Sequence, residues 1–169
     1  YTQVEKDFKN SVIGEEAKLR NARLAFYKGD FEWAQTQLRI IKANTPELIS
    51  NDAIDLSVFI FDNLNQDTLG DALKAFANAD LLRFQHKNDE AILAFSQILK
   101  DFPLNPLVDD IYYQLYKIYR SQQKYEKAAA ELDHIREAYA DEILGDNATF
   151  FLAELYGQYL NDKEKAMSL

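Results

Sequence analysis

A short phrase that occurs four times constrains the fold of this chain of 169 residues more than any other feature. In each copy two apolar residues precede a short polar stretch and an alanine or isoleucine closes it, at 12–17, 48–53, 106–111 and 143–148. The steps from one closing residue to the next are 36, 58 and 37 residues. Self-similarity at such a period is typical of stacked helical hairpins, and the long step predicts about twenty extra residues, enough for one more helix.

We interpret the four phrases as helix starts. Asp and Asn, which recur in the polar stretch of the phrase, are residues that cap the free backbone N–H groups of a helix N-terminus. The apolar residues beside them are expected to contact the first turn and fix the direction in which the chain enters the helix.

A second phrase, in phase with the first, predicts the second helix of each hairpin. Its copies each end in an alanine, at 28–34, 87–91, 123–128 and 162–166. Large apolar residues follow that alanine after four and seven positions in three copies, giving the sets Ala34/Leu38/Ile41, Ala91/Phe95/Ile98 and Ala128/Leu132/Ile135. This spacing predicts one apolar face, and the small alanine predicts close contact between helices. Pro46 and Pro103 then predict that two of these helices end there.

The order of these residues resembles the tetratricopeptide repeat, with Gly29, Phe31, Ala34, Leu38, Ile41 and Pro46 at the family's turn and second-helix positions. The resemblance implies an all-α fold, a right-handed α-α superhelix of helical hairpins in one domain over 1–169. The implied repeats are at about 14–46, 68–103, 107–140 and 146–169. Because 163–169 is only the opening of a second helix, we expect the chain to be a fragment of a longer repeat protein.

Together the phrases predict helices over most of the chain. After a first segment at 1–10, the expected helices are 14–28, 31–44, 48–64, 68–86, 88–101, 107–122, 125–139 and 146–160, with a last one from 163. Helix 48–64 is the extra, irregular element, and its residues 53–61 are apolar around most of the circumference, which predicts that it is buried. The spacing leaves open whether 48–64 or 68–86 is the inserted helix.

Composition and motifs exclude several classes of function. A net charge of -9 and a pI near 4.7 exclude nucleic acid as a partner, since binding to phosphate needs basic surface. No apolar run is long enough to predict a membrane-spanning helix, and the absence of cysteine excludes disulfides and thiolate metal sites. No phosphate-binding or metalloprotease motif occurs. We interpret His86 and His134 as surface residues, and therefore predict no enzyme activity, no cofactor and no metal.

The resemblance implies where a partner would bind, because first helices line the concave surface of such a superhelix. The lining positions are Leu19, Arg23, Phe26, Tyr27, Phe76, Asp80, Arg83, Phe84, Tyr113, Lys117, Arg120, Phe150 and Glu154. Tyr and Arg are enriched among residues that dominate binding energy. The predicted partner-binding residues are accordingly Arg23, Tyr27, Arg83, Phe84, Tyr113, Lys117 and Arg120.

These observations favour a non-catalytic scaffold that binds a peptide or helix of another protein on its concave face. One alternative is a structural spacer that associates with other copies through open repeat ends, and another is a fragment of an enzyme whose catalytic domain lies outside 1–169. The expected partner is a protein or peptide, with no nucleic acid and no membrane insertion of this segment. Resemblance to bacterial cell-envelope tetratricopeptide proteins implies a periplasmic or outer-membrane-associated location.

Overall fold

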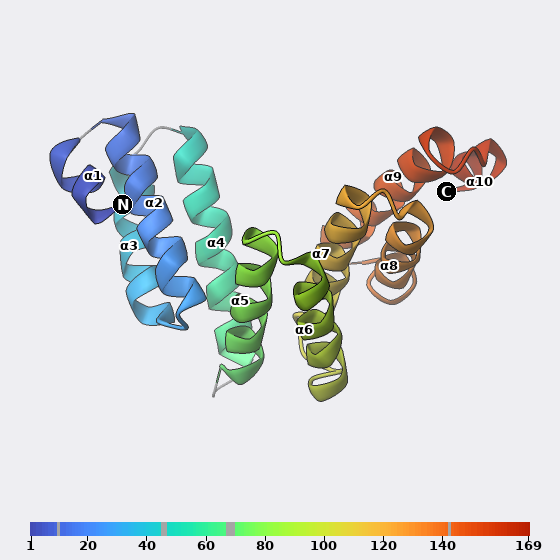
Figure 1. Ribbon diagram of the computed structural model, residues 1–169, viewed down its shortest axis with the longest axis horizontal. Helices are drawn as coiled ribbons and strands as arrows, with labels where there is room; N and C mark the ends of the chain where they lie inside the picture. Colours follow the sequence, from blue (N-terminus) through green and yellow to red (C-terminus); the bar gives the residue numbers. More distant parts are fainter. Residues whose placement is uncertain (10, 45–46, 67–69, 142) are drawn as a thin grey trace. The chain divides into compact units, whose positions relative to one another are not determined.

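The computed structural model describes residues 1–9, 11–44, 47–66, 70–141 and 143–169, and within these ranges the chain is helical without strands (Figure 1). The helices are α1 (Thr2–Asp7), α2 (Val12–Tyr27), α3 (Phe31–Asn44), α4 (Glu47–Gln66), α5 (Asp71–Phe84), α6 (Asn88–Asp101), α7 (Val108–Ser121), α8 (Tyr125–Ala138), α9 (Ile143–Gln158) and α10 (Lys163–Ser168). The predicted all-α class is confirmed, and consecutive helices pack in pairs. The predicted handedness of a superhelix stays a prediction.

The helix boundaries follow the two sequence phrases to within a few residues. α3 and α6 occupy 31–44 and 88–101 as predicted, whereas α9 begins at Ile143, three residues before its expected start. Pro103 lies beyond the end of α6 at Asp101, as predicted. Pro46 and the start of the helix expected from 68 lie outside the described residues.

The chain forms two compact units, Tyr1–Leu81 and Leu82–Leu169. The single continuous domain over 1–169 therefore stays a prediction. Helix α5 contributes its first part to one unit and its last three residues, from Leu82, to the other.

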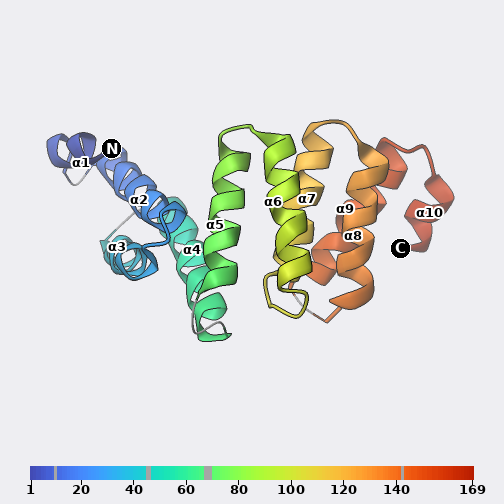
Figure 2. The ribbon, with the colours of Figure 1, turned by 60° about the horizontal axis from the view of Figure 1, so that its bottom comes forward.

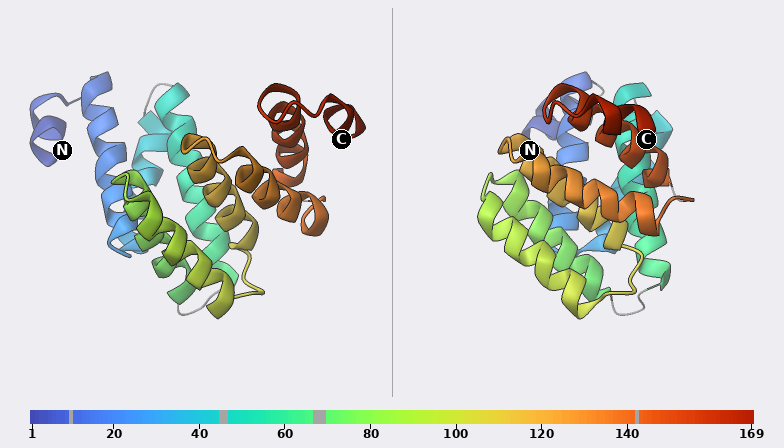
Figure 3. Two further views of the ribbon diagram at one scale, coloured as in Figure 1. Left: turned by 45° about the vertical axis from the view of Figure 1, so that its right-hand side comes forward. Right: turned by 90° about the vertical axis from the view of Figure 1, so that its right-hand side faces the viewer.

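In the first unit, α2 packs against α3 and α4, and the short α1 lies along α2 (Figure 3). The Phe26 ring contacts those of Phe31 and Phe59, with ring centroids 5.8 and 6.1 Å apart. Phe59 of α4 in turn contacts Phe76 of α5 at 5.1 Å. Helix α4 thus contacts both α3 and α5.

In the second unit, α6, α7, α8 and α9 lie side by side, each packed on the next (Figure 2). Tyr116 of α7 lies in one core with Leu132 and Ile135 of α8 and Leu152 and Leu155 of α9. The predicted spacing of alanine, large apolar residue and isoleucine is buried in all three second helices, α3, α6 and α8. Burial of each such large side chain contributes about 1.5–3 kcal/mol.

The turn within each hairpin has the same backbone geometry. Two positions before the second helix begins, one residue lies in the left-handed region, with φ of 75° at Gly29, 59° at His86, 58° at Gln123 and 54° at Asn161. This conformation closes the first helix, because it lets later N–H groups bond to the last free carbonyls. The turns thus recur in register with the second phrase, and His86 lies in a turn as expected.

Two helix starts correct the predicted caps. Ser11 caps α2 by accepting a hydrogen bond from the N–H of Gly14 at 3.2 Å, and Leu107 precedes α7 without any side-chain cap. The acidic residues of the first phrase lie inside the first turn of these helices, where they favour the helix dipole without capping it. Asp side chains cap second helices instead: Asp30 and Asp162 accept from the N–H three residues later at 3.2 and 3.0 Å.

The predicted enclosure of helix 48–64 is wrong for one face of α4. Ala53 and Ile60 are fully buried, but Ile54, Val58 and Phe61 remain 37, 48 and 60% exposed. A helix that is apolar around its circumference buries only the sides on which neighbours pack, and the described residues of the unit leave these three side chains partly uncovered.

Candidate partner-binding surface

Neither a metal-ligand cluster nor a membrane-spanning helix occurs in the described part of the chain. Among the described residues, no group of three or more His, Cys, Asp or Glu side chains is arranged to hold a metal ion. None of the described helices combines the length and the apolarity that crossing a membrane requires.

The predicted binding residues of the first unit, Arg23 and Tyr27, lie one turn apart on α2. Arg23 is half-buried, but Tyr27 is only 7% exposed, and its hydroxyl donates a hydrogen bond to Oδ2 of Asp80 at 3.2 Å. Of the other lining positions, Leu19, Phe26 and Phe76 are buried. In this unit most of the expected lining residues therefore belong to the core, Tyr27 among them, and a role of Tyr27 in binding a partner stays a prediction.

The predicted binding residues of the second unit are Arg83 and Phe84 at the end of α5 and Tyr113, Lys117 and Arg120 on α7. Positions 113, 117 and 120 lie on one face of α7, because residues three and four apart are neighbours on a helix. The Lys117 Nζ atom lies 4.5 Å from the centre of the Tyr113 ring, a cation–π contact. All three α7 residues are half-buried, and Phe84 is exposed.

Arg120 connects α7 to α9. Its Nη1 donates to the hydroxyl of Tyr116 at 2.7 Å, and its Nη2 donates to Oε1 of Glu154 at 2.9 Å. Burial lowers the pKa of Arg120, but hydrogen bonds to Tyr116 and Tyr159 outweigh it, so the pKa lies above the ordinary value. The guanidinium therefore stays charged, is held in place by Tyr116 and Glu154, and has its charge offset by the Glu154 carboxylate.

An aromatic layer lies beneath and beside these cations. The ring of Tyr116 is stacked on Phe151 at 5.5 Å, and Tyr113 contacts both rings, at 5.6 and 6.2 Å. Phe150 contacts Phe151 edge-on but remains 68% exposed. Burial raises the pKa of Tyr113 and Tyr116, so both hydroxyls are neutral at neutral pH. We call Tyr113, Lys117, Arg120, Phe150 and Glu154 the α7/α9 surface.

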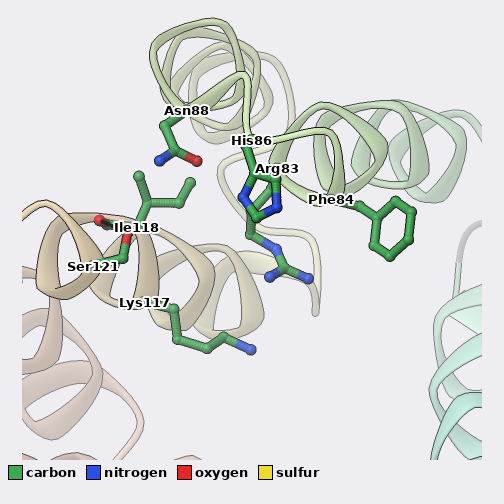
Figure 4. A pocket seen from close by; sticks show the side chains of 7 residues that line it. All are labelled: Arg83, Phe84, His86, Asn88, Lys117, Ile118 and Ser121. Carbon is green, nitrogen blue, oxygen red and sulfur yellow. Dashed lines mark hydrogen bonds between the residues drawn. The ribbon is translucent and has the colours of Figure 1, made fainter.

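A pocket of about 300 Å³ adjoins the α7/α9 surface at Lys117. It is lined by Arg83, Phe84, His86, Asn88, Lys117, Ile118 and Ser121. Figure 4 shows the nitrogen-bearing ends of Arg83, His86 and Lys117 turned toward a common space, while Phe84 lies apart from them. The sequence placed His86 in a turn but did not predict that this turn lies beside α7. The pocket is therefore rich in cationic and polar groups.

A half-buried acid that the sequence did not single out, Glu131, lies on α8. Burial raises the pKa of Glu131 to about 7, and nearby Lys127 only partly opposes the shift. Burial, followed by the charge of Glu131, raises the pKa of Tyr112 and of Tyr119. His134 is exposed and stacks on Tyr112 with ring centroids 4.7 Å apart. This carboxyl group therefore changes its charge near neutral pH.

No protein-family model matches the chain, and neither curated proteins nor solved structures yield a match. The class that the fold defines is an all-α protein in which consecutive helices pack in pairs. The arrangement on α7 and α9 is suited to contact with a polypeptide, because accessible rings and cations stand on helices that a shared core holds in place.

Proposed function

We propose that this chain is a non-catalytic scaffold of the tetratricopeptide type, a right-handed superhelix of hairpins that binds an extended or helical segment of another protein. The α7/α9 surface is the proposed site. The observation that carries the proposal is the exposed Phe150 ring, which contacts Phe151, together with Tyr113, which contacts Phe151 from α7 and carries the Lys117 cation over its ring. Lys117 also lines the pocket at Arg83. Resemblance to envelope tetratricopeptide proteins supports a periplasmic or outer-membrane-associated location.

Each part of the site has a role in this proposal. Phe150 and Tyr113 would cover apolar side chains of the bound segment, since rigid aromatic rings bury large area at a low cost in conformational entropy. Lys117 and Arg83 would contact its carboxylates, and Asn88 and Ser121 its backbone. Arg120 is a positioning residue, because its bonds to Tyr116 and Glu154 hold α7 and α9 together.

The test selects peptides from a random displayed library against the protein and measures their affinity for two double variants. Tyr113→Ala/Lys117→Ala should weaken the selected peptides by about tenfold or more, since truncation of central contacts typically costs above 1 kcal/mol each. Tyr112→Ala/Lys127→Ala, which removes the same residue types elsewhere on α7 and α8, should leave affinity unchanged. Equal affinity for both folded variants would show that the α7/α9 surface is not the site.

Self-association is the second candidate function, and one observation favours it. Exposed apolar side chains surround a pocket of about 380 Å³ near the start of the chain. They are Tyr1, which precedes α1, and Val12 and Ile13 of α2. Apolar side chains gathered at an open hairpin face are suited to contact with another copy. Light scattering at several concentrations tests this function: a spacer should grow in mass with concentration, and Ile13→Ser should abolish that growth.

A further inference from the structure

The exposed face of α4 carries an apolar row that neither the core of its unit nor the proposed peptide site uses. Ile54, Val58 and Phe61 follow one another after four and three residues, which places them on one side of the helix. They are 37, 48 and 60% exposed, whereas Ala53 and Ile60 on the other side are fully buried. The unit therefore covers these three side chains only in part. We call these residues the α4 row.

The charges along α4 are all of one sign. Asp55 and Asp62 directly follow Ile54 and Phe61 in the chain, and both are exposed beside the α4 row. The helix, from Glu47 to Gln66, contains no Lys, Arg or His. An apolar row with an acidic edge therefore faces solvent.

The helix that carries the row is firmly held from behind. The side-chain amide of Gln35 on α3 donates to the backbone oxygen of Ser57 at 2.7 Å, and the Ser57 hydroxyl donates back to Gln35 Oε1 at 2.8 Å. Phe59 contacts Phe26 and Phe76 from the same helix. The row is thus presented in a fixed geometry, and a partner would not have to order it on binding.

The acidic residues beside the α4 row indicate which kind of partner can bind to it. Two copies that met through their α4 rows would bring Asp55 and Asp62 of each copy toward the same carboxylates of the other, and each chain carries a net charge of -9. Like charges at an interface cost several kcal/mol, and opposite charges steer the encounter. A row of about two turns matches the apolar side of one amphipathic helix.

We propose that the α4 row is a docking surface for an amphipathic helix of another protein, one whose apolar side is flanked by Lys or Arg. The apolar side chains of that helix cover Ile54, Val58 and Phe61, and its cations lie beside Asp55 and Asp62. The α4 row shares no residue with the α7/α9 surface. It binds a helix with basic flanks, whereas the α7/α9 surface is proposed to contact carboxylates of its partner.

The experiment uses three synthetic helical peptides and the full chain, with binding measured by fluorescence anisotropy. One peptide carries a leucine row flanked by Lys, the second has Glu in place of Lys, and the third has the composition of the first in scrambled order. The Lys-flanked peptide should bind at least about tenfold more tightly than either of the others, and this advantage should shrink at high salt. Equal binding of the Lys-flanked and scrambled peptides would mean that only net charge is recognised and would overturn the proposal.

Substitutions in and beside the α4 row test whether the Lys-flanked peptide binds there. Phe61→Ser should weaken the Lys-flanked peptide about tenfold or more, and Asp55→Asn/Asp62→Asn should reduce its advantage over the Glu-flanked peptide. Leu93→Ser on α6 is the matched control, since Leu93 is 72% exposed and lies off the row. Because Val58→Lys places a cation on a half-exposed position, it should repel the Lys-flanked peptide even if Phe61→Ser alters folding.

Two further outcomes overturn the proposal. Binding that Val58→Lys and Leu93→Ser affect alike would remove the α4 row as the site. A dimer in light scattering that Val58→Lys abolishes would assign the row to a second copy of the chain. The Tyr113→Ala/Lys117→Ala variant should bind the Lys-flanked peptide normally, so that failure of the α7/α9 surface and failure of the α4 row are distinguished.

Discussion

The hairpin of α7 and α8 and the helix α4 handle their apolar residues in different ways. In the hairpin, the large aliphatic residues Leu132 and Ile135 are completely buried, and the outer side carries Tyr113 and Lys117. On α4, aliphatic and aromatic residues lie on the buried and the exposed side alike, and every charged residue of the helix is acidic. The difference teaches that apolar content alone does not reveal what a helix buries, whereas the spacing of small and large residues does.

The strongest test of this comparison is whether truncating a buried and an exposed apolar residue changes the free energy of unfolding by different amounts. Leu132→Ala should lower the free energy of unfolding by about 2–5 kcal/mol, since a fully buried leucine leaves a cavity. Val58→Ala on the exposed side of α4 should change it by less than about 0.5 kcal/mol. Urea unfolding of both variants measures the two effects, and a large loss at Val58 would mean that the α4 row is covered within the chain.

The helix starts provide the next contrast, because α9 has Gly145 where α4 has Ser50 in the same phrase. A Cβ atom at Gly145 would lie 2.7 and 2.5 Å from the backbone oxygens of Tyr139 and Ala140. Gly145→Ala should therefore destabilise the protein by about 1–3 kcal/mol in thermal unfolding. At Gly157 the nearest atom is 3.7 Å away, so Gly157→Ala should stabilise by up to about 1 kcal/mol. Equal effects would contradict the close approach.

One acid of the α7/α8 hairpin, Glu131, makes stability depend on pH. Burial holds the pKa of Glu131 at about 7, above its ordinary 4.5, so at pH 8 the folded state carries a charge that it disfavours. As the pH falls below 7 the folded state takes up a proton before the unfolded state does, and this residue's cost disappears by about pH 4.5.

Glu131→Gln should accordingly raise stability by roughly 1–2 kcal/mol at pH 8, after allowance for solvent screening, and by little at pH 5. Exposed Glu137→Gln on the same helix is the control and should have an effect near zero at both values. Chemical unfolding of both variants at the two pH values is the measurement. A benefit of Glu131→Gln that is equal at pH 5 and pH 8 would contradict the raised pKa.

The smallest effect concerns the hairpin turns. Gln123 has a φ of 58°, where Gly29 stands at the same position of the first hairpin. Gln123→Gly should stabilise by about 0.5–1 kcal/mol, since glycine adopts this conformation without strain. The neighbouring Gln122 has a φ of -86°, and Gln122→Gly should be neutral or destabilising. Thermal unfolding that ranked the two variants in the opposite order would refute this account of the turn.

Local sequence patterns predicted much of the fold. The phrases placed the helices, and the spacing after each alanine identified the buried faces of α3, α6 and α8, because periodicity and side-chain size act over a few residues. Candidate site residues were predicted less well. Tyr113 and Lys117 lie on one half-buried face of α7, but Tyr27 is buried against Asp80, a residue 53 positions away in the chain.

What the sequence by itself determined is where the helices lie and which side of each regular second helix is apolar, since both depend on neighbouring residues. Tertiary structure alone decided which side of α4 faces solvent, that Arg120 joins Tyr116 to Glu154, that the His86 turn lies beside Lys117, and that Glu131 titrates near neutrality. The physical reason is that burial and charge state depend on atoms that are distant in the chain. The helical periodicity of a sequence reflects only residues within a few positions of one another.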